Sequence, residues 1–203
     1  MSFDSKKMAS PVGELTLVAN GEGLVAILWE TDSPRRVPLG ALRANERHPV
    51  LIETERQLRE YFAGERTSFS LPLALRGTRF QRDVWEALLA IPFGVTTSYG
   101  EIARQLGKPT ATRAVGAANG RNPISIIVPC HRVVGSSGKL TGFAGGLDAK
   151  AFLLALEQGA SKQIVSSSGG PTICLGNDLP EREAKREEDD ADAAVDPVSG
   201  SIV

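Results

Sequence analysis

Residues 97–120 carry two helical patterns joined by a short turn, which restricts this part of the chain to a helical hairpin or a helix-turn-helix. In TTSYGEIARQLG, Ser98 and Glu101 have the spacing of a capping box at a helix start. Residues 107–109, Gly-Lys-Pro, make the turn, and ATRAVGAANG follows as a second helix. Ordinary helical hairpins are common, so the pattern alone leaves both arrangements open.

The second of these helices has almost no side-chain bulk on one face. It begins near the long cationic Arg113, and a recognition helix that reads base edges normally carries several long polar side chains. Small side chains favour close approach to a narrow groove, although close packing on another helix explains them equally well. The small residues are Ala114, Gly116, Ala117 and Ala118.

A further helix is predicted ahead of this pair. Thr78 is placed to cap it, RFQRDVWEALLAI carries one apolar stripe, and Pro92 ends it. The stripe consists of Phe80, Val84, Leu88 and Ile91.

The first 75 residues predict a small α/β unit. GELTLVANGEGLVAILWE, residues 13–30, has two β-rich runs around a glycine-punctuated turn, which indicates a hairpin. Apolar residues recur at helical spacing in 49–62, where Gly64 supplies a stop, and 67–77 is expected to be extended or a linker. This unit shows no cluster of catalytic residue types.

Cys130 stands in IIVPCHRVVG, between two β-branched runs, with a proline before it and His131 after it. A cysteine that only fills a core needs neither neighbour. The other cysteine, Cys174, is 44 positions away in a polar tail, so a disulfide is not expected, and one Cys with one neighbouring His cannot form a tetrahedral metal site. Cys130 is therefore predicted to be a free thiol, and no metal is expected.

Composition excludes little by itself. The chain has 203 residues, 41% of them hydrophobic, a net charge of -1, and no apolar run or leader typical of a membrane span or a signal peptide, so a cytoplasmic location is expected. Residues 76–160 hold ten basic and five acidic side chains, whereas 161–203 hold four and nine. The basic excess is weak support for a polyanionic partner.

The run from Gly77 to Gly146, with Arg-Ala-Val-Gly, Asn-Pro and Pro-Cys-His-Arg-Val at matching spacing, resembles the O6-alkylguanine-DNA alkyltransferases, also called methylated-DNA-protein-cysteine methyltransferases. The match covers about residues 76–158 and its motifs are highly specific. The resemblance implies an α/β (α+β) protein: a ribonuclease-H-like domain over 1–75, a helix-turn-helix domain with the reactive cysteine over 76–160, and an acidic tail over 161–203.

The implied reaction is direct repair of DNA. An alkyl group on guanine O6, and also on thymine O4, moves irreversibly to Cys130, once per molecule and without a cofactor. A thiolate is the nucleophile and a general base can generate it. By resemblance the base is His131, acting through a water and oriented by Glu157. Adjacent residues of an extended strand point to opposite faces, so direct contact of Cys130 with His131 does not follow from their order. Without the family, Glu157 could equally be a solvated helix residue.

The other implied roles concern the DNA and the base. The target nucleotide is flipped out of double-stranded DNA, and the small-residue helix enters the minor groove. Arg113 fills the vacated stack, and Tyr99 contacts the target phosphate and donates to the base; a surface arginine and a half-buried core ring are the alternatives. Asn122 and Pro123 hold the connection to the reactive strand. The DNA-binding set is Arg113, Tyr99, Ala114, Gly116, Ala117, Ala118 and Asn119.

Substrate contacts are implied for the backbone carbonyls of Cys130 and Val133, which would accept from the guanine amine. LTGFAGG would close over the base, with Lys150 near the leaving oxygen. Phe143 and Ala144 stand where some relatives have Tyr and Ser, which leaves backbone N–H groups to read O6 and puts substrate preference in question.

Residues 161–203 depart from the resemblance. SSSGG is typical of a linker and EREAKREEDDADAAVD of a solvated acidic run, so disorder is expected there. The stretch PTICLGNDLP has no explanation from composition. Cys174 within it is expected to be an incidental thiol.

Two hypotheses from other classes compete with repair. A Cys-His hydrolase would use the same dyad but leave the helix-turn-helix without a purpose. A DNA-binding regulator would use the helix-turn-helix to bind DNA without any reaction. It would leave the thiol unexplained, and it would need long polar side chains that read bases. We therefore expect a monomeric alkyltransferase.

Overall fold

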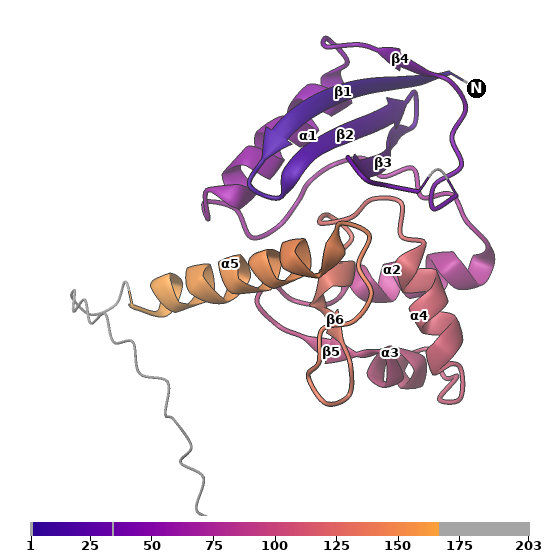
Figure 1. The fold of residues 1–203 in the computed structure, drawn as a ribbon, viewed down its shortest axis with the longest axis vertical. Helices are drawn as coiled ribbons and strands as arrows, with labels where there is room; N and C mark the ends of the chain where they lie inside the picture. Colours follow the sequence, from indigo (N-terminus) through magenta and orange to yellow (C-terminus); the bar gives the residue numbers. More distant parts are fainter. Residues whose placement is uncertain (1, 34, 167–203) are drawn as a thin grey trace, which may run out of the picture. The chain divides into compact units, whose positions relative to one another are not determined.

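The computed structural model describes residues 2–33 and 35–166. The N-terminal half forms a four-stranded sheet in the order β3-β2-β1-β4 (Figure 1). β1 (Phe3–Ser10), β2 (Gly13–Asn20) and β3 (Gly23–Trp29) are antiparallel neighbours, and the short β4 (Leu42–Ala44) lies parallel to β1. The predicted hairpin of residues 13–30 is confirmed as β2 and β3. β1 had no prediction, because its sequence FDSKKMAS lacks a clear alternation of apolar residues.

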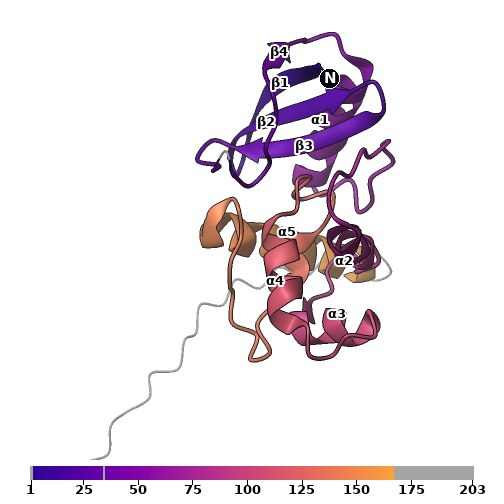
Figure 2. The ribbon, with the colours of Figure 1, turned by 90° about the vertical axis from the view of Figure 1, so that its right-hand side faces the viewer.

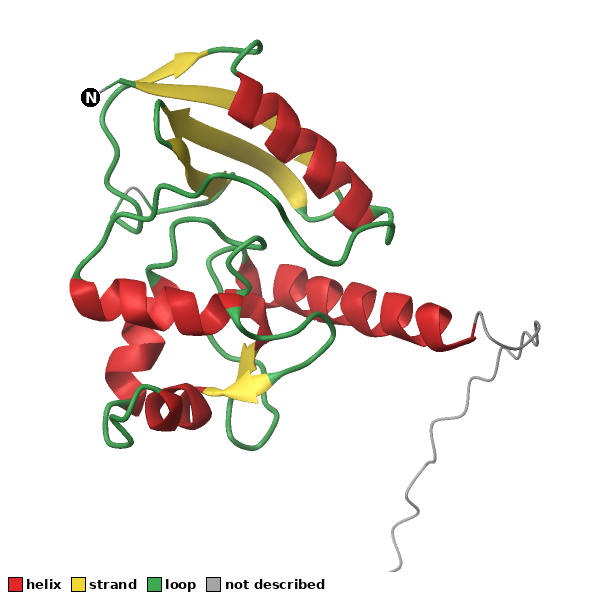
Figure 3. Ribbon diagram, turned by 180° about the vertical axis from the view of Figure 1, so that it is seen from behind, coloured by secondary structure: helices red, strands yellow, loops and turns green. Residues whose placement is uncertain are grey.

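α1 (Pro49–Phe62) lies across one face of this sheet (Figure 3). It coincides with the predicted helix, and Pro stands in its first turn, where the absent N–H costs nothing. Its buried residues include Leu51, Leu58 and Tyr61, which share one core with Leu15 and Leu17 of β2. The hydrophobic burial of this face holds the helix to the sheet.

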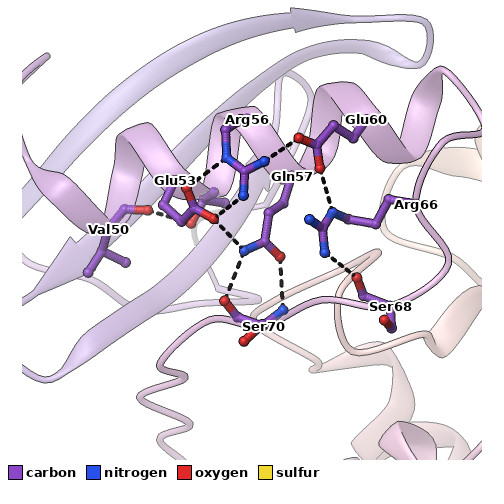
Figure 4. Close-up of polar contacts among 9 residues, drawn as sticks. Val50, Glu53, Arg56, Gln57, Glu60, Arg66, Ser68 and Ser70 are labelled. Atoms are coloured by element: carbon purple, nitrogen blue, oxygen red, sulfur yellow. Dashed lines mark hydrogen bonds and ion pairs between the residues drawn. The ribbon is translucent and has the colours of Figure 1, made fainter.

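Polar side chains of α1 bind the segment that follows it (Figure 4). The Gln57 amide donates to the Ser70 carbonyl and accepts from the Ser70 N–H, both at 2.9 Å. Arg66 donates to Glu60 at 2.7 Å and to the Ser68 carbonyl at 2.8 Å. These bonds fix the chain that leaves the helix, the segment predicted to be extended or a linker.

The second half is mainly helical. α2 (Arg79–Leu89), α3 (Tyr99–Gln105) and α4 (Thr112–Gly120) pack together, and α3 and α4 lie side by side in both views (Figures 1 and 2). The Thr78 capping box on α2 is complete, with Gln81 as its second partner. At α3 the Ser98 side chain accepts from the Glu101 N–H at 3.1 Å, as the capping-box spacing predicted.

The rest of this half consists of β5 (Thr97–Ser98) paired in parallel with β6 (Val133–Val134), the 3₁₀ turn η1 (Cys130–Arg132) and the long helix α5 (Gly146–Ser166). α5 continues to Ser166, past the predicted start of the tail at residue 161. The expected disorder, the acidic run and Cys174 lie outside the described residues.

A backbone hydrogen bond joins the two halves, from the Ile27 N–H of β3 to the Pro123 carbonyl at 2.9 Å. Within the N-terminal half, Leu24 of β3 donates to the Pro72 carbonyl and accepts from the Ala74 N–H, both at 2.8 Å. One apolar core runs through both halves, from β2 and β3 to α2, α4 and α5. A sheet domain and a helical domain are thus confirmed as the architecture, with a common core. No helix in the described part of the chain is long and apolar enough to cross a membrane.

Candidate active site

Cys130 lies in the 3₁₀ turn η1, not in the extended strand that the sequence predicted. The Cys130 N–H donates to the Val128 carbonyl at 2.8 Å, and the Arg132 N–H donates to the Pro129 carbonyl at 3.0 Å. Pro129 fixes the backbone direction at the turn entrance. The turn buries its three side chains, with Cys130 3%, His131 0% and Arg132 7% exposed. Side-chain alternation therefore does not apply to Cys130 and His131.

Asn122 closes the loop that leads from α4 to the reactive turn. Its side-chain amide donates to the Val128 carbonyl at 2.8 Å, and its side-chain oxygen accepts from the Ile124 N–H at 3.0 Å. The loop contains Ile126 with φ of 76°, a left-handed conformation that a β-branched residue rarely adopts. The Asn122 side chain thus forms two hydrogen bonds across this strained loop.

Burial raises the pKa of the Cys130 thiol, and this effect outweighs the groups that favour the thiolate. The Asn122 side chain and the charges of Arg36 and Lys150 act the other way and lower the pKa. The thiol is consequently protonated at neutral pH. Reaction as a nucleophile requires a base to remove its proton.

Glu157 of α5 is fully buried at the centre of a polar cluster (0% exposed), so the interpretation of a solvated helix residue is wrong. Its Oε1 lies 2.8 Å from His131 Nε2 and accepts from Arg132 Nη2 at 3.0 Å. Its Oε2 accepts from Arg132 Nε at 2.9 Å and from the Gly94 N–H at 3.1 Å. This fork of two parallel bonds to an arginine is a strong ion-pair geometry.

These contacts determine which nitrogen of His131 is basic. Burial raises the pKa of Glu157, but hydrogen bonds from His131 and Arg132 lower it more and bring it to about 2. An ionised carboxylate only accepts, so His131 Nε2 carries a proton and donates to it. Nδ1 of the neutral ring is then the free base, and it is buried without a hydrogen-bond partner among the described residues. Burial lowers the pKa of His131, so the ring is neutral at neutral pH.

The two shifted pKa values predict acid sensitivity of the fold. The pKa of His131 is below its ordinary 6.5 in the folded protein, so the unfolded chain takes up a proton first as the pH falls. Folding stability should therefore decrease from about pH 6.5 downward, and decrease again between about 4.5 and 2 as Glu157 loses its advantage. Urea unfolding midpoints at a series of pH values measure this. His131→Asn should remove the decrease that starts near pH 6.5; a wild-type midpoint constant from pH 7 to 4.5 would contradict the prediction.

Lys150 of α5 holds the loop after β6. Its ammonium is fully buried and donates to the Val133 carbonyl at 2.7 Å and to the Thr141 carbonyl at 2.6 Å. Burial lowers its pKa. Two of its three N–H groups thus bind backbone, and the Val133 carbonyl that was expected to meet guanine already accepts one of them. The Cys130 carbonyl likewise accepts the Val133 N–H. Each carbonyl keeps a second lone pair.

The loop of Phe143 rests on the N-terminal sheet domain. The Phe143 ring meets Trp29 of β3 edge-on at 5.3 Å between centroids and lies 6.3 Å from the His131 ring. Gly145 follows so close to Trp29 that a Cβ there would lie 2.6 Å from the indole. Ala144 between them is partly exposed. The Phe143 ring therefore packs between Trp29 and the His131 ring.

The predicted DNA-contacting residues divide between two faces of α4. Arg113, Ala114 and Ala117 are exposed and Gly116 is partly exposed. Ala118 and Asn119 are both only 3% exposed, which corrects the expectation that they face DNA. Ala118 belongs to the apolar core, and its carbonyl accepts from the indole of Trp85 on α2 at 2.9 Å.

Tyr99 is the first residue of α3 and links the helix pair to the loop after β6. Its hydroxyl accepts from Thr141 Oγ1 at 3.3 Å. Gly116 of α4 lies beside the Tyr99 ring, and a Cβ there would lie 3.8 Å from the ring, an ordinary van der Waals contact. The half-buried position fits either of the two interpretations given for Tyr99.

Two residues of the N-terminal half reach this site, although residues 1–75 showed no cluster of catalytic residue types. The Tyr61 hydroxyl donates to Glu157 Oε1 at 2.8 Å. Arg36 donates to the Asn122 carbonyl and to the Ile27 carbonyl, the latter at 2.9 Å, and pairs with Asp32. Tyr61 and Glu157 are 96 positions apart, so no local pattern could have joined them. Arg132, in contrast, stood within the motif beside His131. No cluster of three potential metal ligands occurs in residues 2–33 and 35–166.

The comparisons with known proteins cover both halves. Residues 79–159 match the family described as "6-O-methylguanine DNA methyltransferase, DNA binding domain", and residues 5–75 match "6-O-methylguanine DNA methyltransferase, ribonuclease-like domain". The methylated-DNA–protein-cysteine methyltransferase of Methanosarcina acetivorans is 52% identical over 149 residues, which are 73% of this chain and 94% of that protein. The one from Mycobacterium leprae is 52% identical over 155 residues, 75% of this chain and 91% of that protein.

Among solved structures, Mycobacterium tuberculosis OGT in complex with DNA is similar, with a TM-score of 0.71 and 48% identity over 79% of this chain and 94% of that one. A structure from Methanococcus jannaschii has a TM-score of 0.55 at 29% identity, over 75% and 93% of the two chains. A buried Cys-His-Glu site beside a helix pair, on a domain preceded by a ribonuclease-like sheet, defines a class of cysteine alkyltransferases. The chain belongs to the methylated-DNA–protein-cysteine methyltransferase family and is an enzyme of that kind.

Proposed function

We propose that this protein repairs O6-alkylguanine, and also O4-alkylthymine, in double-stranded DNA by moving the alkyl group to its own Cys130. The observation that carries the proposal is the buried thiol next to a neutral histidine whose other nitrogen is bound to an ionised glutamate. The M. tuberculosis relative, 48% identical, was solved in complex with DNA, which supports DNA as the partner. The protein acts as a monomer in the cytoplasm and needs no cofactor, since the lesion itself supplies the alkyl group.

The reaction balances with residues of the site alone. His131 Nδ1 takes the Cys130 proton through a water molecule, and Glu157 stabilises the imidazolium that forms. The thiolate attacks the alkyl carbon, an S–C bond forms, and the C–O6 bond breaks with its electron pair moving to the base. The base then takes up a proton, for which the Tyr99 hydroxyl is the proposed donor. Solvent water returns a proton to Tyr99 and takes the one held by His131, so both side chains end neutral. The product is a thioether, and no second nucleophile in the described site is positioned to remove it. Transfer therefore occurs once per molecule.

Access to the sulfur requires extrusion of the base. O6 lies within a stacked pair, and extrusion costs a few kcal/mol, less for a damaged pair. The exposed side of α4, with Arg113, Ala114 and Ala117, is suited to a narrow groove, and the Tyr99 ring lies beside Gly116. We propose that the Arg113 side chain fills the gap that the flipped base leaves in the stack. The loop of Phe143 and Ala144, held by Lys150, covers the base in the site.

Intact mass spectrometry tests the proposal. The full chain is incubated with a duplex that contains one O6-methylguanine, and the protein should gain one methyl group, located at Cys130 by peptide mapping. An unmodified duplex serves as the control. Repeated turnover of the lesion without a mass gain, or hydrolysis of a thioester substrate without transfer, would overturn the proposal. The second outcome would favour the hydrolase hypothesis.

Arg113→Ala should separate base extrusion from chemistry. Single-turnover transfer from duplex DNA should slow much more than transfer from free O6-benzylguanine, because a free base needs no extrusion. Tyr99→Phe should slow both reactions mildly, by the equivalent of about 1–3 kcal/mol for one lost buried hydrogen bond. If Arg113→Ala slowed transfer from both substrates equally, Arg113 would have no role in base flipping. It would instead support the pocket or the fold.

A further inference from the structure

The hydroxyl of Tyr61, in the N-terminal domain, reaches the glutamate of the Cys-His-Glu site. Tyr61 lies near the end of α1, is 1% exposed, and donates to Glu157 Oε1 at 2.8 Å. The same oxygen binds His131 Nε2 at 2.8 Å and Arg132 Nη2 at 3.0 Å. Tyr61 and His131 therefore share one acceptor atom.

The direction of this hydroxyl is fixed by packing. The Tyr61 ring lies 5.5 Å from Phe62, 5.4 Å from Phe69 and 6.3 Å from Phe93, measured between centroids. Phe93 precedes Gly94, whose N–H donates to the other oxygen of Glu157, and the Arg132 guanidinium lies 5.7 Å from the Phe93 ring. The aromatic cluster thus aims both donors at the carboxylate. Burial, and then the negative charge of Glu157, raise the pKa of Tyr61. The phenol therefore keeps its proton and remains a hydrogen-bond donor.

We propose that Tyr61 is a positioning residue of the transfer reaction, through which the N-terminal domain sets how strongly Glu157 attracts the proton on His131. The inference rests on the proposed function of Cys130, His131 and Glu157. Each hydrogen bond to a carboxylate takes up part of its charge, so three donors on Oε1 leave less of it for any one of them. The phenol makes Glu157 a weaker partner for an imidazolium and keeps His131 neutral enough to accept the thiol proton.

The charged and titratable groups around His131 come from three elements. Glu157 and Lys150 lie on α5, Cys130 and Arg132 on η1, and Tyr61 on α1. Burial is the main cause of the lowered pKa of His131; Glu157 opposes it, and Arg132 and Lys150 add to it. Without the Tyr61 hydroxyl, the negative charge on Glu157 would be less neutralised by donors and would stabilise a protonated His131 more strongly. The pKa of His131 would then rise.

The test is the pH dependence of single-turnover transfer from free O6-benzylguanine, which requires no DNA binding. In Tyr61→Phe the ring remains and only the hydroxyl is lost. The acidic limb of the rate profile should move to higher pH by about half a unit or more. Site-specific 3,5-difluorotyrosine at position 61, a stronger donor that keeps the hydroxyl, should move the limb to lower pH. This second variant decides the question if Tyr61→Phe does not fold.

Thr54→Val is the matched control on the same helix. Thr54 is fully buried, and its hydroxyl donates to the Val50 carbonyl at 2.7 Å, away from Glu157. The melting temperature of Thr54→Val can fall, but the acidic limb of its pH–rate profile should coincide with that of the wild type. A limb that stays in place in both Tyr61 variants, or one that moves the opposite way, would reduce Tyr61 to a packing role. Absence of benzyl transfer to Cys130 in the wild type would instead reject the proposed function itself.

Discussion

Replacing Cys130 with alanine should abolish alkyl transfer while DNA binding persists. Without the sulfur no S–C bond can form, and no other cysteine occurs in the described residues. The fold should survive, because the change removes one small buried atom from a turn held by backbone bonds and by the Asn122 amide. Intact mass after incubation with methylated duplex measures transfer, and a gel-shift or anisotropy titration measures binding.

Cys174→Ala is the control for this variant. It replaces the other cysteine of the chain and should keep the full mass gain of one methyl group. A mass gain that persists in Cys130→Ala would show a second acceptor and overturn the assignment. Loss of both transfer and DNA binding in Cys130→Ala would point to a folding defect, which the melting temperature of the variant detects.

Glu157→Gln should have the second largest effect, on both stability and rate. The variant leaves the buried Arg132 guanidinium without its carboxylate, and breaking a buried pair in this way costs about 3–5 kcal/mol of unfolding free energy. The imidazolium of His131 also loses its partner, so single-turnover transfer should slow by about 10²-fold or more. The rate is measured well below the melting temperature of the variant, and stability by urea unfolding.

Glu53→Gln provides the comparison at the surface. Glu53 also pairs with an arginine, Arg56 at 2.5 Å, but both side chains are about half exposed. Its hydrogen bonds lower its pKa to about 2, the value of Glu157. Water screens such a pair, so the variant should keep the transfer rate and nearly all of the stability. If the two variants lost stability equally, burial would not be the reason that Glu157 matters.

Local patterns sufficed for the helices and for the identity of the nucleophile. The Thr78 capping box, the proline in the first turn of α1 and the turn before α4 act over three or four residues, so the sequence determined them. The setting of Cys130 between proline and histidine marked the reactive turn. The chain around it was nevertheless predicted as a strand, because β-branched residues favour extended backbone and the 3₁₀ hydrogen bonds depend on the Asn122 loop.

The tertiary structure decided what surrounds the sulfur. Glu157 looked equally like a surface residue, since a single carboxylate on a helix carries no sign of its partners, and only packing of α5 against η1 buried it between His131 and Arg132. Ala118 is buried in the apolar core that α2 shares with α4, and Asn119 is buried beside it in the chain. Tyr61 came to the site from another domain. Residue types determined by themselves that a thiol, a base and an acid were present; contacts between distant segments determined which atoms meet, because hydrogen bonds and burial act over a few ångströms of space and not along the sequence.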